Sequence, residues 1–239
     1  MPIPNSNLSN LANFRNGISG NLLDWLAFNR DLAFFSPQTL ALVAPFPPTE
    51  LMQNVSGLTD PKDFAAHGCD ILKALINTSP TPINEFANIL DFGVGVGRLA
   101  RMFKGCRGKY TGIDVDARHV EWISSALDYV TGIVTKPKQV LPLKDKYFDC
   151  IISISVFTHM NENDQFFYLE ELARVAQSGS SLFLTVHGER ALQRAETESQ
   201  IFQMLSVQKS SIPETRHMLS TKGFNFILQQ GHLTSSNYN

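Results

Sequence analysis

The sequence predicts an α/β protein of the Rossmann-like, doubly wound class, with a mostly parallel sheet, helices on both of its faces and an N-terminal helical cap. Two observations carry this prediction. From about residue 86, short β-rich runs alternate with helical patterns, which is typical of βαβ units. One of these runs leads into a loop with glycine at every second position. We therefore expect residues 1–85 to form a helical cap or substrate lid and residues 86–239 to form the sheet domain.

Five runs are predicted to be strands of this sheet. The clearest is residues 148–155, an almost unbroken apolar run of the kind found in strands that are covered on both faces. We place this strand in the middle of the sheet. In chain order, the predicted strands are residues 88–92, 110–115, 132–135, 148–155 and 181–186.

Helical patterns fill the segments around these strands. The best defined begins after Asn161, which can cap its first turn, and carries Asp164 in that turn. Apolar residues, Phe166, Leu169 and Leu172 among them, then recur at helical spacing, and Gly179 is predicted to end the helix. The predicted helices are residues 22–35 and 63–75 before the sheet, and 98–103, 117–127 and 162–176 between its strands.

Composition disfavours several classes of function. The net charge is −2 and the pI is about 6.3, so there is no broad basic surface for a nucleic acid. The three cysteines lie far apart without metal-ligand spacing, and no acidic triad suggests a metal site. The N-terminus lacks a signal-peptide pattern, and no apolar run reaches the ~20 residues of a membrane span. We expect a cytoplasmic protein with neither membrane nor metal as partner.

The sequence NILDFGVGVGRL predicts a strand, a glycine loop and the start of a helix. Glycine lets the backbone approach a ligand closely, and a helix N-terminus attracts negative charge, so the loop is predicted to hold something small and partly anionic. A dinucleotide fingerprint beginning at Gly95 fits only if Ala100 replaces its last glycine. The fuller description is D-x-G-x-G-x-G, beginning at Asp91.

Asp114 ends the second predicted strand, seventeen residues after Gly97. Because parallel strands end at one edge of a sheet, we expect its carboxylate beside the glycine loop, where it can accept both hydroxyls of a ribose. The competing interpretation is an acid in the turn before the helix that starts near Asp116. Loop and acid together predict a nucleoside-binding site.

With these motifs, the chain resembles the class I S-adenosylmethionine-dependent methyltransferase superfamily over roughly residues 60–188. The segments ILDFGVGVGR, YTGIDVD, LPLKDKYFDCIISISVFTHM, EELARVAQSG and SSLFLTVHG are similar to the family's motifs and follow in the same order. LPLKDKYFD looks most like bacterial enzymes that methylate small molecules. PPTELMQNVSGLTDPKDFAAHG resembles an N-terminal segment that caps the cofactor in one bacterial subgroup.

The resemblance implies S-adenosylmethionine as the cofactor. Asp91 would help to hold its methionine amino group, Asp114 its ribose, and Val115 would contact its adenine. Ser155 would line the cofactor or substrate side. The implied cofactor-binding residues are Asp91, Gly93, Gly95, Gly97, Asp114, Val115 and Ser155.

Three departures from the family pattern matter. Many relatives carry an acid for the adenine amino group where this chain has Pro137. The sequence SVFTHM after the fourth strand is not a motif of nucleic-acid methylases. Such folds usually end with an antiparallel pair of strands, whereas only about 50 residues follow Gly188, with one candidate strand at 224–228. The C-terminal strands are therefore expected to be incomplete.

His159 is the candidate catalytic residue. It follows the fourth predicted strand at the carboxyl edge, where ligands of such sheets bind, and could act as general base toward an oxygen or nitrogen acceptor. The alternative is a histidine that caps the next helix or packs the loop. His187, after the fifth strand, is a second candidate, and Arg98 and Arg101 are expected to be solvated surface charges.

The main functional hypothesis is thus a methyltransferase that acts on a small-molecule acceptor. An NAD-dependent oxidoreductase is a second hypothesis, supported by Asp114 and by the partial fingerprint ending at Ala100. A module that binds S-adenosylmethionine without catalysis is a third.

Overall fold

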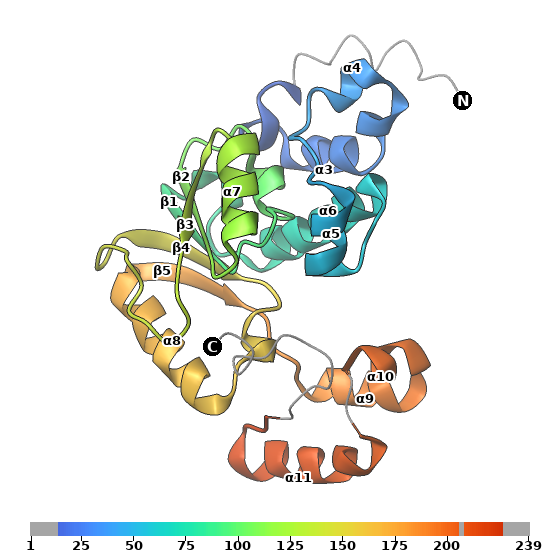
Figure 1. Cartoon of the computed structure of the whole chain (residues 1–239), viewed down its shortest axis with the longest axis vertical. Coiled ribbons are helices and arrows are strands. Elements are labelled where there is room, and N and C mark those ends of the chain that lie inside the picture. The colour runs from blue at the N-terminus through green and yellow to red at the C-terminus, as the bar shows by residue number, and fades with distance from the viewer. Residues whose placement is uncertain (1–13, 206–207, 227–239) are drawn as a thin grey trace.

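A computed structural model describes residues 14–205 and 208–226 of the chain. Its centre is a five-stranded sheet with the order β3-β2-β1-β4-β5, in which all neighbouring strands are parallel (Figure 1). The strands are β1 (Asn88–Phe92), β2 (Lys109–Asp114), β3 (Val130–Val134), β4 (Phe148–Ser153) and β5 (Ala176–Leu184). The predicted α/β class and its parallel sheet are confirmed.

The predicted position of β4 is wrong by one strand. β1 lies in the middle of the sheet, between β2 and β4, and β4 lies between β1 and β5. Its almost complete burial follows from being internal and not from being central. The strand order reverses between β1 and β4, and in open α/β sheets ligands bind beyond the carboxyl ends of the strands at such a point.

Helices cover both faces of the sheet, as predicted. On one face α6 (Pro61–Thr78) and α7 (Ala117–Ala126) enclose a core that includes Leu72, Ile89 and Ile123. On the other face α8 (Glu162–Val175) packs against a second core.

The N-terminal part consists of helices that share the core of the sheet. The indole N–H of Trp25 donates to the carbonyl of Met102 at 2.8 Å, and Trp25 belongs to the same buried cluster as Ile89. Residues on both sides of the proposed boundary at residue 86 therefore share one hydrophobic core. The helical elements here are η1 (Gly17–Ser19), α3 (Leu22–Arg30), η2 (Leu32–Phe35), α4 (Pro37–Leu40), α5 (Thr49–Ser56), α6 and η3 (Ile83–Glu85).

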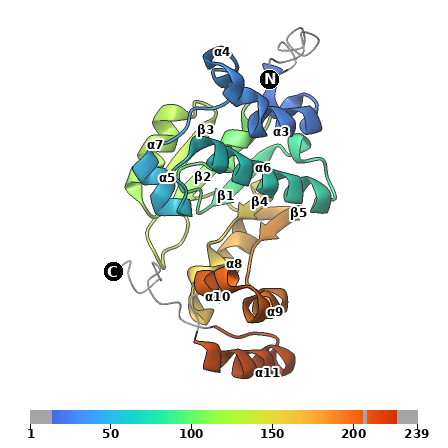
Figure 2. The same cartoon turned by 90° about the vertical axis from the view of Figure 1, so that its right-hand side faces the viewer.

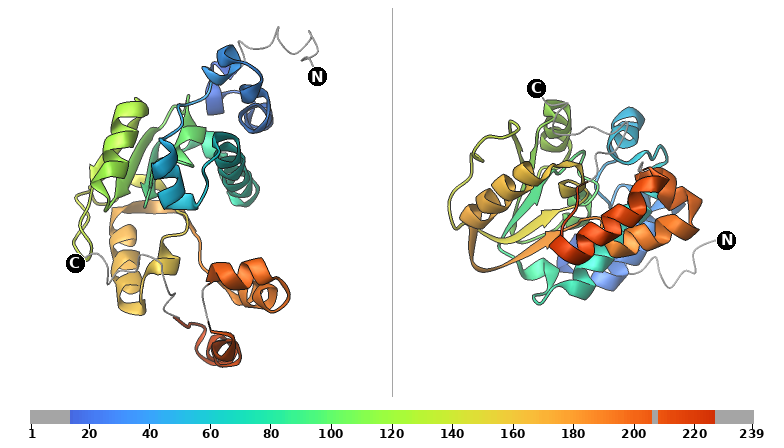
Figure 3. Two further views of the ribbon diagram at one scale, coloured as in Figure 1. Left: turned by 45° about the vertical axis from the view of Figure 1, so that its right-hand side comes forward. Right: turned by 90° about the horizontal axis from the view of Figure 1, so that it is seen from below.

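After β5 the described residues form further helices joined by irregular segments. Here α9 (Glu189–Thr197), α10 (Ser199–Leu205), η6 (Lys209–Ser211) and α11 (Ile212–Lys222) follow. These helices lie side by side at the opposite end of the molecule from α3 and α4 (Figures 2 and 3). Of the predicted strand at 224–228, residues 224–226 are irregular and residues 227–228 lie outside the described part.

Two predicted elements are wrong. The helix expected at 98–103 is only a short 3-10 helix, η4 (Ala100–Phe103), so the glycine loop does not continue into an α-helix. Gly179 does not end α8, because α8 passes directly into β5 at Ala176. Instead Gly179 lies within β5 with a φ of +80°, at a bulge where the pairing with β4 shifts register.

α8 buries a different face from the one that its apolar spacing predicts. Leu172 is fully buried, but Phe166 is 58% and Leu169 38% exposed. Polar residues on the buried side hold the connection between β3 and β4: Glu171 accepts a hydrogen bond from the amide of Leu141, and Arg174 donates to its carbonyl. These hydrogen bonds turn polar side chains toward the protein and leave two large apolar ones in solvent.

Two further facts concern chemistry and environment. Cys69, Cys106 and Cys150 are not joined in disulfides. Within residues 14–205 and 208–226, no helix has both the length and the apolar character required to cross a lipid bilayer.

We expect Leu172→Ala to lower the free energy of unfolding by ~2–5 kcal/mol, because it leaves a cavity in a fully buried position. Leu169→Ala is the matched control on the same helix and should cost much less, since its side chain is already partly in solvent. Urea denaturation of both variants checks this. Equal losses would contradict the observed orientation of α8.

Candidate functional site

The glycine loop turns back over the end of β2. The amides of Gly93 and Val94 both donate to the carbonyl of Ile113, at 2.9 and 3.0 Å. Gly93, Gly95 and Gly97 all have positive φ, at 78°, 53° and 79°, a region that side chains other than glycine rarely adopt. The predicted conformational need for glycine is therefore real.

Each of the three glycines also faces a different neighbouring element. A Cβ atom on Gly93 would lie 2.3 Å from Val156, after β4. One on Gly97 would lie 3.0 Å from Leu127 at the end of α7, and one on Gly95 would lie 3.4 Å from Val55 of α5. Hence the glycines serve close packing of the loop by the protein itself, which the sequence did not indicate.

Asp114 lies beside the glycine loop, as its spacing predicted. Its Oδ2 accepts the amide of Gly95 at 2.8 Å, and its Oδ1 accepts the amide of Asp116 at 2.9 Å. A carboxylate has about four lone-pair positions, so two remain for further donors such as a pair of hydroxyls. The residue after it, Val115, is half-buried at the same end of β2.

The surroundings of Asp114 on α7 were not predicted from the sequence. His119 is buried, neither ring nitrogen forms a hydrogen bond with a described residue, and its Nδ1 lies 3.5 Å from Asp114 Oδ1. Its Nε2 lies 3.7 Å from Asp116 Oδ2, and Asp116 is paired with Arg118 at 2.6 Å. The i, i+3 spacing of Asp116 and His119 across a helix start was the available signal.

A cleft of about 270 Å³ lies next to this acidic turn. It opens between α5 and the first turn of α7. Its lining residues are polar except for one leucine, and they are Glu50, Leu51, Gln53, Asn54 and Arg118.

Asp91 is buried on the same face of the sheet as Asp114. Its Oδ2 accepts the hydroxyl of Tyr110 at 2.7 Å. Burial raises the pKa of Asp91 to about 7, although the Tyr110 hydrogen bond acts against this; the charge of Asp114 raises the pKa further and Arg98 lowers it. Its predicted contact with the methionine amino group stays a prediction.

The segment after β4 packs against the glycine loop from the other side. Val156 contacts Gly93, and the ring of Phe157 lies 6.1 Å from that of Phe92 at the end of β1. Ser155 is exposed, has a φ of +60° and donates its amide to Thr185 at 2.7 Å. His159 ends η5 (Phe157–His159) and is half-buried at this carboxyl edge, whereas His187 is exposed.

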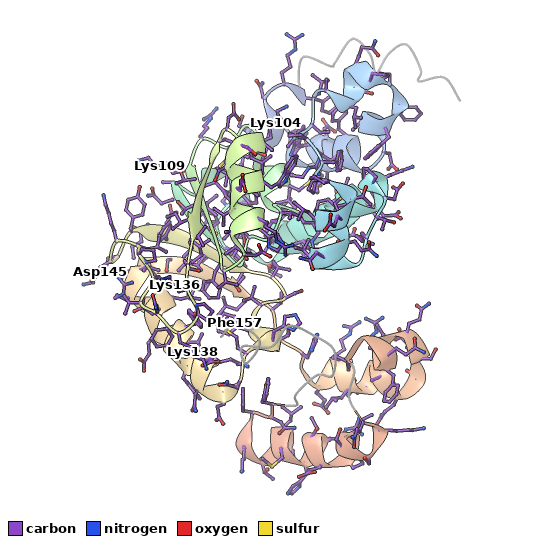
Figure 4. The ribbon with its side chains drawn as sticks, in the orientation of Figure 1. Lys104, Lys109, Lys136, Lys138, Asp145 and Phe157 are labelled. Carbon is purple, nitrogen blue, oxygen red and sulfur yellow. The ribbon has the colours of Figure 1, made fainter. Side chains whose placement is uncertain are left out.

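The connection after β3 is bound to α8. Pro137 is half-buried between two exposed lysines, Lys136 and Lys138, which Figure 4 shows beside α8. The amide of Lys138 donates to the Tyr168 hydroxyl at 3.0 Å, and its Nζ lies 3.8 Å from Asp164. No acid stands at the position of Pro137 to serve adenine.

The expectation that Arg98 and Arg101 are solvated is wrong. Arg101 is only 1% exposed, and burial lowers its pKa to about 10. Arg98 is half-buried and lies 3.1 Å from the Nδ1 of His67 on α6. Both follow the glycine loop directly, and the N-terminal helices that cover this loop remove them from solvent.

No group of three or more histidine, cysteine or acidic side chains suited to a metal ion occurs in the part of the chain that the structure describes.

Comparison with known proteins agrees with this geometry. Residues 90–184, from β1 to the end of β5, match the family model of the methyltransferase domain. These residues are a class I S-adenosylmethionine-dependent methyltransferase domain. The glycine loop and Asp114, which this match includes, fit the cofactor of the family, because a loop of positive-φ glycines and a carboxylate with open lone pairs meet at one edge.

One curated relative shares little sequence with this chain. Ajmaline N-methyltransferase of Rauvolfia serpentina is 27% identical over 122 residues, which are 48% of this chain and 41% of that protein. The chain thus spans less than half the length of this relative.

Two solved structures are similar to part of this chain. A putative S-adenosyl-L-methionine-dependent methyltransferase from Methanococcus maripaludis has a TM-score of 0.43 and 16% identity, over 64% of this chain and 74% of that one. The glycopeptide N-methyltransferase MtfA, in complex with S-adenosyl-L-methionine, has a TM-score of 0.43 and 15% identity, over 52% and 56%.

We expect Asp91→Asn to remove a pH dependence of stability. The folded protein binds the Asp91 proton more tightly than the unfolded chain does. The resulting contribution to the free energy of unfolding is therefore complete below pH 4 and is lost as pH rises through about 7. The loss should reach ~1.4 kcal/mol per pH unit within that range. Urea denaturation from pH 4.5 to 8 of wild type, Asp91→Asn and the exposed control Asp128→Asn measures it. A constant difference between wild type and Asp91→Asn would show that the carboxylate is ionised throughout.

Proposed function

We propose that this chain transfers the methyl group of S-adenosylmethionine to a nitrogen or oxygen atom of a small-molecule acceptor. The contact between Asp114 and Gly95 carries the proposal, because it unites the ribose acid and the glycine loop within the matched domain. A nitrogen acceptor is supported by the distant N-methyltransferase relative. The absence of a broad positive charge supports a small acceptor over a nucleic acid.

The protein's part in this reaction is to bind and orient. Bound S-adenosylmethionine supplies a methyl group attached to a positively charged sulfur. This sulfur is a good leaving group because it departs as a neutral thioether. The residues proposed to hold it are Asp114, through its open lone pairs, the glycine-loop backbone, Asp91, and Val115 and Ser155 at the ends of β2 and β4. Excluding water and fixing the acceptor in line supply most of the rate enhancement.

His159 is the proposed general base. It lies on η5, whose neighbours Val156 and Phe157 contact the glycine loop and the end of β1. A base there can take the proton that an oxygen or protonated nitrogen acceptor must lose.

Binding and turnover together test the function. Calorimetry should show that S-adenosylmethionine and S-adenosylhomocysteine bind and that NAD does not. Release of S-adenosylhomocysteine should then be followed with a panel of small amines and hydroxyl compounds. Binding of NAD alone would overturn the proposal in favour of an oxidoreductase. Cofactor binding without turnover across the panel would favour a binding module.

We expect Asp114→Asn to weaken S-adenosylhomocysteine binding about 10- to 100-fold, because the amide loses charge-assisted acceptor positions for hydroxyl donors. Glu121→Gln, an exposed acid on α7, is the matched control and should bind as wild type. Titration calorimetry gives both affinities, and circular dichroism confirms the fold. A folded Asp114→Asn variant with wild-type affinity would remove Asp114 from the site.

We expect His159→Ala to lower turnover by ~10²-fold or more with little change in S-adenosylhomocysteine affinity, since a general base acts in the transition state. His217→Ala, at an exposed position on α11, controls for the substitution itself. Turnover is measured across pH with an acceptor from the panel. Wild-type turnover in the variant would assign His159 a structural role, and a parallel loss of affinity would place it in the binding wall.

A further inference from the structure

Arg101 is a buried cation whose guanidinium has no carboxylate partner among the described residues. Its Nε donates to the carbonyl of Pro45 at 2.7 Å, and its Nη2 donates to the carbonyl of Ala44. The guanidinium also lies 3.5 Å from the ring centroid of Phe46. One side chain therefore binds three consecutive residues of the N-terminal part through two hydrogen bonds and a cation–π contact.

The same residue is fixed at its backbone to the glycine loop. The amide of Arg101 donates to the carbonyl of Gly97 at 2.9 Å. Arg101 thus connects the loop, four residues earlier in the chain, with the segment 44–46, more than fifty residues away.

Segment 44–46 leads directly into α5, and α5 covers the glycine loop. Pro47 and Pro48 lie between this segment and α5, and their rings restrict φ, so the connection has little conformational freedom. At the far end of α5, Val55 faces Gly95, and Met52 is buried in a cluster with Val96. The position of α5 over the loop therefore depends on the contacts that Arg101 makes with residues 44–46.

We propose that Arg101 is a positioning residue that fixes α5 against the glycine loop and so strengthens cofactor binding without touching the cofactor. The second half of this inference rests on the proposed function. With 1% of its surface exposed, Arg101 offers no atoms to a ligand.

A buried guanidinium is not explained by general stability. A well-packed apolar side chain of similar volume often replaces a buried charge without loss, because the charge must be desolvated. What an apolar side chain cannot do is hold two carbonyls and a ring in a fixed direction. The planar, forked donors of arginine suit this task, and lysine presents a single compact charge.

The test compares Arg101→Met with Arg107→Met, an exposed arginine in the turn that follows. Hydrogen exchange of the amides of residues 52–57, which are the end of α5 and its C-cap, reports how firmly α5 is held. Calorimetry with S-adenosylhomocysteine reports binding. We expect Arg101→Met to accelerate exchange in residues 52–57 and to weaken binding, each about 10-fold or more, with unchanged exchange in β1 and β2. Arg107→Met should behave as wild type.

The outcomes decide separate questions. Unchanged exchange in α5, or equal acceleration in α5, β1 and β2, overturns the positioning role. Faster exchange in α5 with wild-type affinity overturns its link to the cofactor. If the wild-type protein does not bind S-adenosylhomocysteine, the proposed function fails, while exchange still decides whether Arg101 fixes α5.

A second variant applies if Arg101→Met does not fold. Pro48→Gly keeps Arg101 and its contacts but loosens the link to α5 at an exposed position. The same two effects are expected, and unchanged exchange and affinity in this variant overturn the proposal.

Discussion

The hydrogen bond from the Gly95 amide to the Asp114 carboxylate is the constraint on which the site depends. It joins the loop after β1 to the end of β2, at the edge where the strand order reverses. A loop of positive-φ glycines has no regular structure to satisfy its amides, so these need partners of this kind. Once the loop is held, α5, α7 and the segment after β4 can each pack against one of its glycines.

Two buried ionisable groups connect the loop region to other parts of the fold. Asp91 accepts a hydrogen bond from Tyr110 and so joins β1 to β2 next to the site. Arg101 binds the carbonyls of residues 44 and 45 and brings the N-terminal part onto the loop. Burial raises the pKa of the acid and lowers that of the base. The N-terminal helices are thus part of the site as well as of the core.

The sequence was informative where function depends on residues that are neighbours in a motif. The glycine loop, Asp114 and the edge that carries His159 were all placed from strand ends and spacing. The residue patterns did not predict α5, which entered only through the resemblance of PPTELMQNVSGLTDPKDFAAHG to a segment that caps the cofactor. Nor did they indicate the contacts of His119 and Tyr110. Their importance arises from partners on other elements, and no local pattern records such partners.

The sequence by itself determined the parallel sheet, the glycine loop and the acid beside it, because apolar runs, glycine spacing and strand ends are local properties of the chain. Only the tertiary structure decided which face of α8 is buried and that Arg101 leaves solvent. Both depend on distant partners: the connection between β3 and β4 turns α8 through Glu171 and Arg174. The carbonyls of residues 44 and 45 lie more than fifty residues from Arg101. They accept hydrogen bonds from a charged side chain that helical periodicity alone would place in water.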